Sequence, residues 1–426
     1  MYGLVGKTLK HSLSKMIHEA LRPIDYHLFE TDDIQSFLTN TPFKAINVTI
    51  PYKQAVIPYC DYLSDLVKRT NSVNTIIKKN GLLFAYNTDF EALDQIAKYF
   101  LPQDKNLVIG IIGNGATARS MKEALIKNNY NNITVFARNP NKNEPPLTSL
   151  QNYSNLELLI NTTPVGMYPN NEQSLTLDLT AFKNLSCVYD VVYNPYKTKL
   201  LLDAEALNIK TLDGLLMLVI QAVLSNGKFF NTTYSKDTYE TLYKKALKYL
   251  LNITFIGLPF SGKTRYSKEL EYRLNKPIID IDSLIEHQEK SSIETIFNQM
   301  GEPYFRVLEE QITVNQATSF NHILSTGGGI IQNDRAMQAI KQNSVVVYID
   351  IDEAIMDQIN YHSRPHVKNK SDLLILKNRR HKLYLKYADV IINKSTLDVD
   401  KILSEIEVNI DAYISDQWAK LKSIRN

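Results

Sequence analysis

Cysteine is scarce in this sequence, and clusters of histidine are missing. Only two cysteines occur, Cys60 and Cys187, and they lie far apart without a C-x-x-C pair. Disulfide-stabilised secreted domains and zinc sites both require several closely spaced ligands. We therefore expect reduced thiols in a cytoplasmic protein, and no metal site built on cysteine.

Long hydrophobic runs and an excess of one charge are also missing. The longest apolar stretch runs from Leu215 to Leu224, contains Gln221 and is far shorter than a bilayer span. The opening residues MYGLVGKTLKHS do not have the basic-then-apolar pattern of a signal peptide, so none is expected. A formal net charge of +3 is too small for a nucleic-acid footprint. Neither a membrane nor a nucleic-acid partner is expected.

Apolar strand-like runs alternate with helical patterns along the chain, which indicates an α/β fold. At roughly 100–200 residues per domain, the 426 residues suggest two or three domains. Strands are expected at 3–5, 44–50, 72–77, 107–112, 132–137, 277–282, 322–326, 344–350 and 388–393. Helices are expected at 15–21, 90–99, 118–128 and over 214–250 with a loop near Asn226–Gly227, and residues 411–426 as a polar helical tail.

The first glycine-rich turn, GNGATA at 113–118, follows an expected strand and opens an expected helix. Its G-x-G-x-x-A pattern lets backbone N–H groups approach the pyrophosphate of a dinucleotide at a helix N-terminus. The next expected strand ends in Ala137–Arg138–Asn139, where an NAD site would place an acidic residue. A guanidinium suits a 2′-phosphate, although a solvated arginine at a strand end is the alternative. The pattern favours NADP(H).

Lys53 in NVTIPYKQ and Asp89 in YNTDF are candidates for chemistry in this half. Brought together, an ammonium and a carboxylate form a proton-transfer pair suited to reducing a carbonyl to an alcohol. Taken singly, each is more simply explained as a surface charge, because most lysines and aspartates are exposed.

Residues 1–227 carry, in order, the motifs YGLVGKTLKHSLS, NVTIPYK, SVNT, YNTD, GNGATAR, INTTPVGM, YDVVYNPYKT and DGLLMLVIQA. This series resembles shikimate dehydrogenase. The resemblance implies a substrate domain and an NADP Rossmann domain that reduce 3-dehydroshikimate to shikimate, with Lys53 as proton donor and Asp89 as its partner. It implies that the substrate is held by Ser12, Ser14, Thr49, Asn74, Asp89, Tyr193 and Gln221. It further implies cofactor contacts from Gly113, Asn114, Gly115, Ala116, Thr117 and Arg138, and a nicotinamide side lined by Thr163, Val191, Gly214 and Met217.

The second glycine-rich turn, GLPFSGKT at 257–264, also lies between an expected strand and helix. The pattern G-x-x-x-x-G-K-T cradles nucleotide phosphates, with Lys263 on the β- and γ-phosphates and Thr264 on Mg²⁺. A guanine-selective N-K-x-D is absent, since Asn393–Lys394–Ser395–Thr396 fails at its last position. ATP is therefore favoured over GTP. The two glycine turns differ in kind, which indicates a fusion of two proteins and not a duplication.

Residues 252–395 resemble shikimate kinase through GLPFSGKT, PIIDID, IFNQMGEPYFRVLEE, LSTGGGII, HSRPH, RRHKLY and YADVIIN. The resemblance implies a five-stranded parallel sheet and use of ATP and Mg²⁺. It implies nucleotide contacts from Gly257, Ser261, Gly262, Lys263, Thr264 and the lid residue Arg364, with Asp280 reaching Mg²⁺ through water. It implies that shikimate is held by Asp282, Arg306, Gly327, Gly328, Gly329 and Arg380, with Asp282 also orienting the attacking hydroxyl.

The residues themselves leave alternatives open in this second half. Two arginines, Arg306 and Arg380, suit a carboxylate, but Arg306 could instead pair with Glu309 or Glu310. Asp280 could serve only as a cap at a strand end. Pro259–Phe260 replace the Met-Gly that is customary in the phosphate turn of this family.

Together the two halves predict a bifunctional enzyme of consecutive steps, in which the product of the first site is the acceptor of the second. The expected division is a substrate domain at 1–96 rejoined by 215–248, a Rossmann domain at 97–214, a kinase domain at 250–410 and a tail at 411–426. One alternative is a kinase half that only senses shikimate. Another is a dehydrogenase half that prefers quinate or NAD. Oligomeric state does not follow from the sequence.

Overall fold

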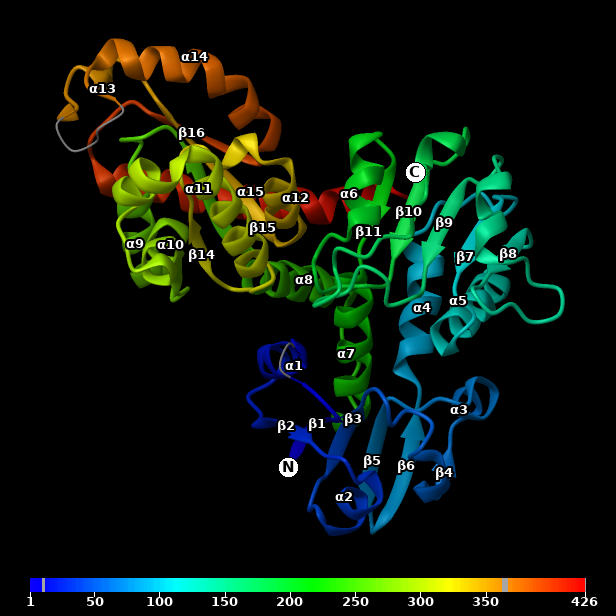
Figure 1. The fold of residues 1–426 in the computed structure, drawn as a ribbon. Coiled ribbons are helices and arrows are strands. Elements are labelled where there is room, and N and C mark those ends of the chain that lie inside the picture. Colours follow the sequence, from blue (N-terminus) through cyan, green and yellow to red (C-terminus); the bar gives the residue numbers. More distant parts are fainter. Residues whose placement is uncertain (10–11, 362–366, 426) are drawn as a thin grey trace. The chain divides into compact units, whose positions relative to one another are not determined.

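The computed structural model describes residues 1–9, 12–361 and 367–425. Arg364, expected as the lid arginine, lies outside the described residues. Within them, the strands form three sheets, and no helix has both the length and the apolar character that crossing a membrane requires (Figure 1).

The chain divides into two compact units, each made of separate segments. The first unit consists of Met1–Asn194, Leu200–Ala246 and Trp418–Asn426. The second unit consists of Pro195–Lys199 and Leu247–Gln417.

The first sheet of the first unit is mixed and has six strands in the order β2-β1-β3-β5-β6-β4. Strand β1 pairs in parallel with β2 and β3, whereas β5 runs antiparallel to β3 and β6. Asn80 and Gly81 join β5 to β6 with φ angles of +51° and +82°, the left-handed pair that a tight hairpin needs. The strands are β1 Tyr2–Gly6, β2 Tyr26–Glu30, β3 Ala45–Val48, β4 Tyr62–Leu63, β5 Thr75–Lys79 and β6 Leu82–Tyr86. Their helices are α1 Ser14–Leu21, α2 Ile34–Asn40, α3 Asp65–Thr70 and α4 Thr88–Tyr99.

The second sheet of the first unit has five parallel strands in the order β11-β10-β9-β7-β8. Its central strands are buried and almost wholly apolar, as expected where helices cover both faces. The order reverses at β7, where ligands bind beyond the carboxyl ends of such strands. The elements are β7 Ile109–Ile112, α5 Ala116–Lys127, β8 Ile133–Phe136, β9 Leu158–Asn161, β10 Cys187–Asp190, α6 Lys199–Ala206 and β11 Lys210–Leu212.

The long helical region after β11 divides at a place that the sequence did not indicate. Helix α7 spans Gly214–Phe230 and α8 spans Lys236–Leu250, so the loop expected near Asn226–Gly227 is wrong. The helix ends instead at Asn231, whose φ is +51°. Gly227 serves close approach: a Cβ there would lie 2.6 Å from the carbonyl oxygen of Thr232, where the chain turns back.

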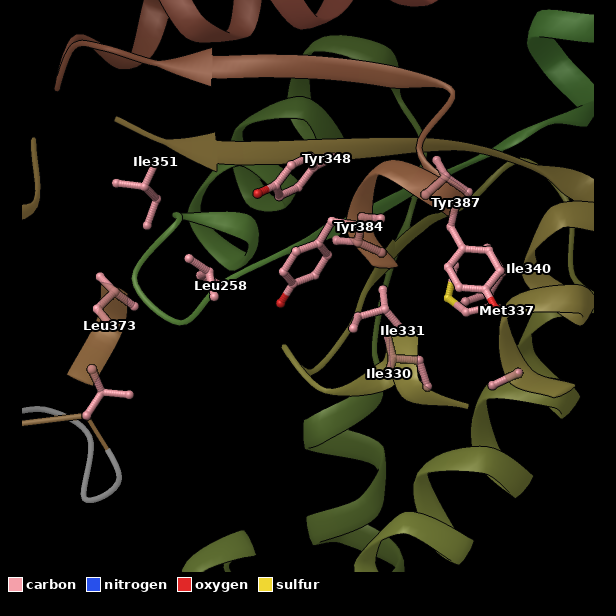
Figure 2. Close-up of a cluster of buried hydrophobic side chains, with 14 of the residues drawn as sticks. Leu258, Ile330, Ile331, Met337, Ile340, Tyr348, Ile351, Leu373, Tyr384 and Tyr387 are labelled. Carbon is pink, nitrogen blue, oxygen red and sulfur yellow. The ribbon is translucent and has the colours of Figure 1, made fainter. Parts of the chain in front are cut away.

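The second unit contains a five-stranded parallel sheet in the order β13-β14-β12-β15-β16, which confirms the expected sheet. Figure 2 shows part of its core, where the rings of Tyr348 and Tyr384 stack with centroids 4.8 Å apart near Leu258. The strands are β12 Asn252–Gly257, β13 Ile278–Asp280, β14 Ile323–Ser325, β15 Ser344–Ile351 and β16 Val390–Lys394. The helices are α9 Lys263–Leu274, α10 Ile281–Glu289, α11 Ile293–Ala317, α12 Asp334–Asn343, α13 Glu353–Met356, α14 Lys370–Tyr387 and α15 Val399–Ser423.

The last residues of the chain belong to the first unit and carry apolar side chains into its interior. The expected division between 410 and 411 falls inside α15. Trp418, Leu421 and Ile424 are all buried. The Trp418 ring lies 5.3 Å from the Tyr243 ring and 5.8 Å from the Phe100 ring, measured between centroids. The helix end is therefore part of a packed core.

We predict that Trp418→Ala lowers the free energy of unfolding of the first unit by about 3 kcal/mol, because it removes a large buried ring and leaves a cavity. Urea unfolding followed by circular dichroism measures the change. Val408→Ala is the matched control on the same helix, since Val408 is 68% exposed. Equal stability of the two variants would contradict the prediction.

A buried polar cluster joins α1, β2, β3 and α7 inside the first unit. His18 is fully buried, stacks on Tyr26 at 4.3 Å and lies with Nδ1 3.2 Å from Nδ2 of Asn226. The Tyr26 hydroxyl donates to Oδ1 of Asn47 at 2.8 Å. Burial lowers the pKa of His18 to about 3, while a side-chain hydrogen bond with Asn47 acts in the opposite direction.

We predict that His18 makes the first unit sensitive to acid. The folded protein keeps the imidazole neutral, whereas the unfolded chain binds a proton near pH 6.5. The stability due to this burial is therefore complete above pH 6.5 and is lost as the pH falls toward 3, by up to ~1.4 kcal/mol per pH unit. Fluorescence of Trp418, the single tryptophan of the chain, reports unfolding of this unit. His18→Phe should reduce the slope, and an unchanged slope would show that His18 is not responsible.

Candidate active sites

Lys53 and Asp89, the predicted proton-transfer pair, meet in the first unit. Lys53 Nζ lies 2.6 Å from Oδ2 of Asp89. Asp89 stands in the first turn of α4, where Asn87 caps the helix by accepting the backbone N–H of Phe90 at 3.1 Å. Lys53 follows β3 in a turn closed by the N–H of Tyr52 donating to the carbonyl of Thr49 at 2.9 Å. Both charges are thus held by local backbone structure.

Asn74 connects this pair to a second expected substrate residue. Its buried Nδ2 donates to Oδ1 of Asp89 and to Oγ1 of Thr88, each at 2.9 Å, and lies 3.3 Å from Oε1 of Gln221 on α7. Each carboxylate oxygen of Asp89 therefore has its own donor. Four residues predicted from separate motifs, Lys53, Asn74, Asp89 and Gln221, are brought together.

The other expected substrate residues are placed less directly. Ser12 accepts the backbone N–H of Ser14 at 3.2 Å at the start of α1. Thr49 follows the end of β3 and is half-buried. Burial raises the pKa of Tyr193, which keeps its hydroxyl protonated. Within the described residues, no hydrogen bond joins Ser12, Ser14 or Thr49 to the pair of Lys53 and Asp89.

Asn47 supports Asn74 from behind and was not among the predicted residues. Its Nδ2 donates to the carbonyl of Asn74 at 3.2 Å and lies 3.3 Å from Oγ1 of Thr75. Through Tyr26 it extends to the buried cluster around His18. The available signal was a polar residue inside the buried run Ala45–Val48.

The first glycine-rich turn leaves a helix N-terminus free for an anion. Gly113 has a φ of +100°, and a Cβ there would lie 2.9 Å from Oγ1 of Thr162. Gly115 is the N-cap of α5, with no side-chain cap and open space where a Cβ would stand. The first amides of α5, at Ala116 and Thr117, have no partner within the helix. This arrangement fits a pyrophosphate.

Arg138 follows β8 at the base of a loop that folds back on the same turn. The loop closes through a bridge between Ala137 and Pro146. Asn114 Nδ2 donates to the carbonyl of Asn139 at 2.9 Å and to Oε2 of Glu144 at 3.0 Å. Arg138 is exposed and makes no hydrogen bond or ion pair within the described residues. Its guanidinium is available for a phosphate.

The residues expected near the nicotinamide stand at the carboxyl ends of β9 and β10. Asn161, fully buried, accepts the backbone N–H and the hydroxyl of Thr163 at 3.0 and 2.7 Å. It also donates to Oδ1 of Asp190 at 3.0 Å. Sequence reasoning missed this buried pair, which orders the two loops.

Gly214 lets α7 begin directly against the loop after β10. Any side chain there would clash with the carbonyl of Val191. Met217 follows on α7 and is half-buried. Gly214 and Val191 are thus brought together.

The second glycine-rich turn joins β12 to α9 in the second unit. Gly262, with a φ of +98°, is the N-cap of α9 and has no side-chain cap. Lys263 Nζ donates to the carbonyls of Gly257 and Leu258 at 2.9 and 3.0 Å and lies 3.5 Å from Oγ of Ser261. The first amides of α9 have no partner within the helix, an arrangement that fits a phosphate in the same way as that of α5.

Thr264 and Asp280, expected near Mg²⁺, come close through β14. The Thr264 hydroxyl lies 3.4 Å from Oγ of Ser325, and Ser325 is in register with Asp280. One carboxylate oxygen of Asp280 accepts the N–H of Ser283 at 2.9 Å and so caps α10. Within the described chain, no three His, Cys, Asp or Glu side chains gather into a metal site. The oxygens present fit Mg²⁺, which usually keeps water and substrate phosphate among its ligands.

Arg306 lies against the triple-glycine turn and is already paired. Its NH1 lies 2.6 Å from Oε2 of Glu309 and its NH2 lies 2.9 Å from Oε1 of Glu302. A Cβ on Gly329 would lie 2.5 Å from both terminal nitrogens of Arg306. The pairing with Glu309 that the sequence left open is present, whereas Glu310 pairs with Arg335 at 2.9 Å.

The other two glycines of the turn are also in close contact with charged side chains. A Cβ on Gly327 would lie 2.6 Å from Oε1 of Glu309 and 3.1 Å from Oδ1 of Asp282. The carbonyl of Gly328 accepts from Arg380 NH1 at 3.0 Å and from the Tyr384 hydroxyl at 2.7 Å.

Glu309 was missed as a functional residue, although its place three residues after Arg306 on one helix was a signal. Burial raises the pKa of Glu309, and the Arg306 guanidinium opposes that shift. The side chains of Arg306, Arg380, Asp282 and Glu309 therefore lie around the glycine backbone of residues 327–329.

Comparison with protein families matches both halves of the chain. Residues 4–76 match the model of the shikimate dehydrogenase substrate binding domain, and residues 259–411 match the model of shikimate kinase. The shikimate dehydrogenase (NADP(+)) of Methanosphaera stadtmanae is 31% identical over 277 residues, which is 58% of this chain and 96% of that protein. The shikimate dehydrogenase (NADP(+)) of Clostridium perfringens is 33% identical over 265 residues, which is 58% of this chain and 97% of that protein.

A solved structure agrees with these matches. The chorismate mutase/shikimate 5-dehydrogenase fusion protein from Clostridium acetobutylicum aligns with a TM-score of 0.52 and 28% identity, over 57% of this chain and 94% of that one. The chain belongs to the shikimate dehydrogenase family and carries a shikimate kinase domain behind it.

Proposed function

We propose that this protein catalyses two consecutive reactions, the NADPH-dependent reduction of 3-dehydroshikimate to shikimate and the ATP-dependent phosphorylation of shikimate to shikimate 3-phosphate. The related dehydrogenases and the match to the kinase model support both steps. The observation that best supports the proposal is the 2.6 Å contact between Lys53 and Asp89. It makes an ammonium available where the family resemblance requires a proton donor. We place the protein in the cytoplasm, in keeping with its two free thiols, Cys60 and Cys187.

In the dehydrogenase site, Lys53 is the proton donor to the oxygen of the substrate ketone. NADPH, when bound, supplies the hydride to the carbonyl carbon. Asp89 orients the Lys53 ammonium through the 2.6 Å contact, and Asn74 holds Asp89 through its second oxygen. The substrate hydroxyls and carboxylate exchange hydrogen bonds with the polar residues predicted from the sequence, namely Ser12, Ser14, Thr49, Tyr193 and Gln221. A pocket of this kind discriminates against analogues that lack a hydroxyl, because buried donors would stay unpaired.

Cofactor selection falls to the first glycine-rich turn and the loop after β8. Amides from Gly113 to Thr117 bind the pyrophosphate, and Arg138 binds the 2′-phosphate. Thr163, Val191, Gly214 and Met217 surround the nicotinamide. The free guanidinium of Arg138 and the uncapped N-terminus of α5 support this assignment.

In the kinase site, charge neutralisation and positioning carry the reaction. ATP with Mg²⁺ supplies the phosphoryl group. Lys263 and the loop amides bind phosphate oxygens, and the oxygens of Thr264 and Asp280 serve Mg²⁺, the latter through water. Arg306 and Arg380 bind the carboxylate of shikimate, and Asp282 orients the attacking hydroxyl.

We assign the substrate domain to residues 1–96 with 215–248, the Rossmann domain to 97–214, the kinase domain to 250–410 and a terminal segment to 411–426. Two other functions compete with this one. A kinase half that only senses shikimate has no need of Lys263, which the chain retains. A dehydrogenase half selective for NAD has no need of Arg138.

A one-pot assay tests the proposal. The protein, given 3-dehydroshikimate, NADPH, ATP and Mg²⁺, should form shikimate 3-phosphate. Shikimate accumulation without ADP release would support the sensing module, and faster turnover with quinate or NAD would support the second alternative.

We predict that Lys53→Ala lowers kcat for reduction at least about 100-fold, because it removes the proton donor. Lys263→Ala should have the converse effect on phosphorylation. Each variant serves as the control for the other, measured by NADPH oxidation and by shikimate-dependent ADP release. If either substitution abolished both activities in folded protein, the two sites would not be independent.

We predict that Arg138→Glu raises the KM for NADPH about tenfold or more and leaves the KM for NADH unchanged or lower, since the new carboxylate repels the 2′-phosphate and suits a ribose hydroxyl. Lys142→Glu is a charge-matched control on the same exposed loop. An equal effect of the two substitutions would mean that general electrostatics, and not a direct contact, selects the cofactor.

A further inference from the structure

The phosphate loop of the kinase domain contains a strained residue. Phe260 has a φ of +66°, a conformation that bulky side chains rarely adopt. Its ring packs on the Tyr361 ring, with centroids 5.4 Å apart, and on the apolar cluster beneath the loop. Such a conformation persists only where the surroundings hold it.

Lys263 holds one end of this loop. Its ammonium donates to the carbonyls of Gly257 and Leu258. A lysine that moves to nucleotide phosphates gives up these two contacts. The shape of the loop then depends on the contacts at its other end, at Phe260 and Ser261.

Lys394, at the end of β16, holds two other carbonyls of the loop, those of Phe260 and Ser261. It is only 8% exposed, and its Nζ lies 3.3 Å from the carbonyl oxygen of Ser261 and 3.5 Å from that of Phe260. Its ammonium also lies 5.8 Å from the centroid of the Tyr266 ring. Lys394 makes no ion pair within the described part of the chain, and the charge that acts on it from α9 is that of Arg265. A buried ammonium is costly unless it is hydrogen-bonded, so Lys394 depends on these two carbonyls.

The peptide plane links these carbonyls to the amides that face the phosphate. In a trans peptide the C=O of one residue and the N–H of the next point in opposite directions. With the Ser261 carbonyl turned toward Lys394, the N–H of Gly262 points away from it, out of the loop. Burial, which lowers the pKa of Lys394, also makes its charge sensitive to the loss of these carbonyls.

We propose that Lys394 is a positioning residue of the kinase site, whose ammonium holds the carbonyls of Phe260 and Ser261 so that the loop keeps its anion-binding shape when Lys263 turns to the phosphates of a nucleotide. The inference rests on the proposed kinase function. It assigns a role to the second residue of Asn393–Lys394–Ser395–Thr396, a segment that does not match a guanine-binding motif.

Lys394→Met in the full-length protein tests the inference by two readouts that need no turnover. The dissociation constant for ADP, measured by calorimetry, should rise about tenfold, as expected for the loss of a charged hydrogen-bond donor. Backbone amides of 258–264 should exchange hydrogen faster in the ligand-free protein, while those of β12 and β15 keep their protection. Lys394→Arg should restore most of the affinity. Lys401→Met, an exposed lysine of α15, is the matched control.

Phe260→Gly provides the second arm, because it removes the strain that Lys394 holds. In that background Lys394→Met should cost clearly less affinity than in the wild type. Strictly additive effects, unchanged loop exchange, or loss of protection throughout β12 and β15 would each overturn the inference. Wild-type protein that binds ADP but does not phosphorylate shikimate would remove the proposed activity and leave the loop inference standing.

Discussion

One constraint organises both active sites: the first amides of a helix have no partner inside that helix. The chain meets it twice, at Gly115 before α5 and at Gly262 before α9, and both N-caps lack a side-chain cap. In each case a parallel strand delivers the turn at the carboxyl edge of a sheet, where the helix dipole favours an anion. The two turns differ in what stands beside them, a free arginine at one and a buried lysine at the other.

In the first unit, buried polar groups hold the side chains of the candidate dehydrogenase site. Asn74 has its carboxamide committed to Asp89 and Thr88, and Asn47 supports it from the neighbouring strand. Unpaired polar groups are costly in a protein interior, so such a network has few alternative arrangements. Asn161 does the same for the loop that carries Thr163. These hydrogen bonds hold Asp89 and Thr163 in place.

The acceptor side of the kinase domain uses glycine for a different purpose. Gly327 and Gly329 leave room for Glu309, Asp282 and Arg306, which would collide with any side chain at those positions. Arg306 is held by Glu302 and Glu309, which restricts the conformations of its side chain. An arginine pre-oriented by acids loses less conformational entropy on binding a carboxylate.

The sequence by itself determined the α/β class, the two glycine-rich turns and most of the residues around them. Backbone amides at a strand-to-helix turn need glycines at fixed spacing, and that spacing can be recognised in the sequence alone. Only the tertiary structure decided which partners complete the sites. Asn47, Asn161 and Lys394 contact their targets across elements or behind them, and side-chain burial of that kind leaves little periodic trace. The break expected at Asn226–Gly227 is wrong for the same reason. Glycine at position 227 leaves room for the carbonyl of Thr232, whereas the helix continues to Phe230. The conformation of a glycine-rich turn depends on residues that are neighbours in the sequence, whereas packing depends on which distant segments meet.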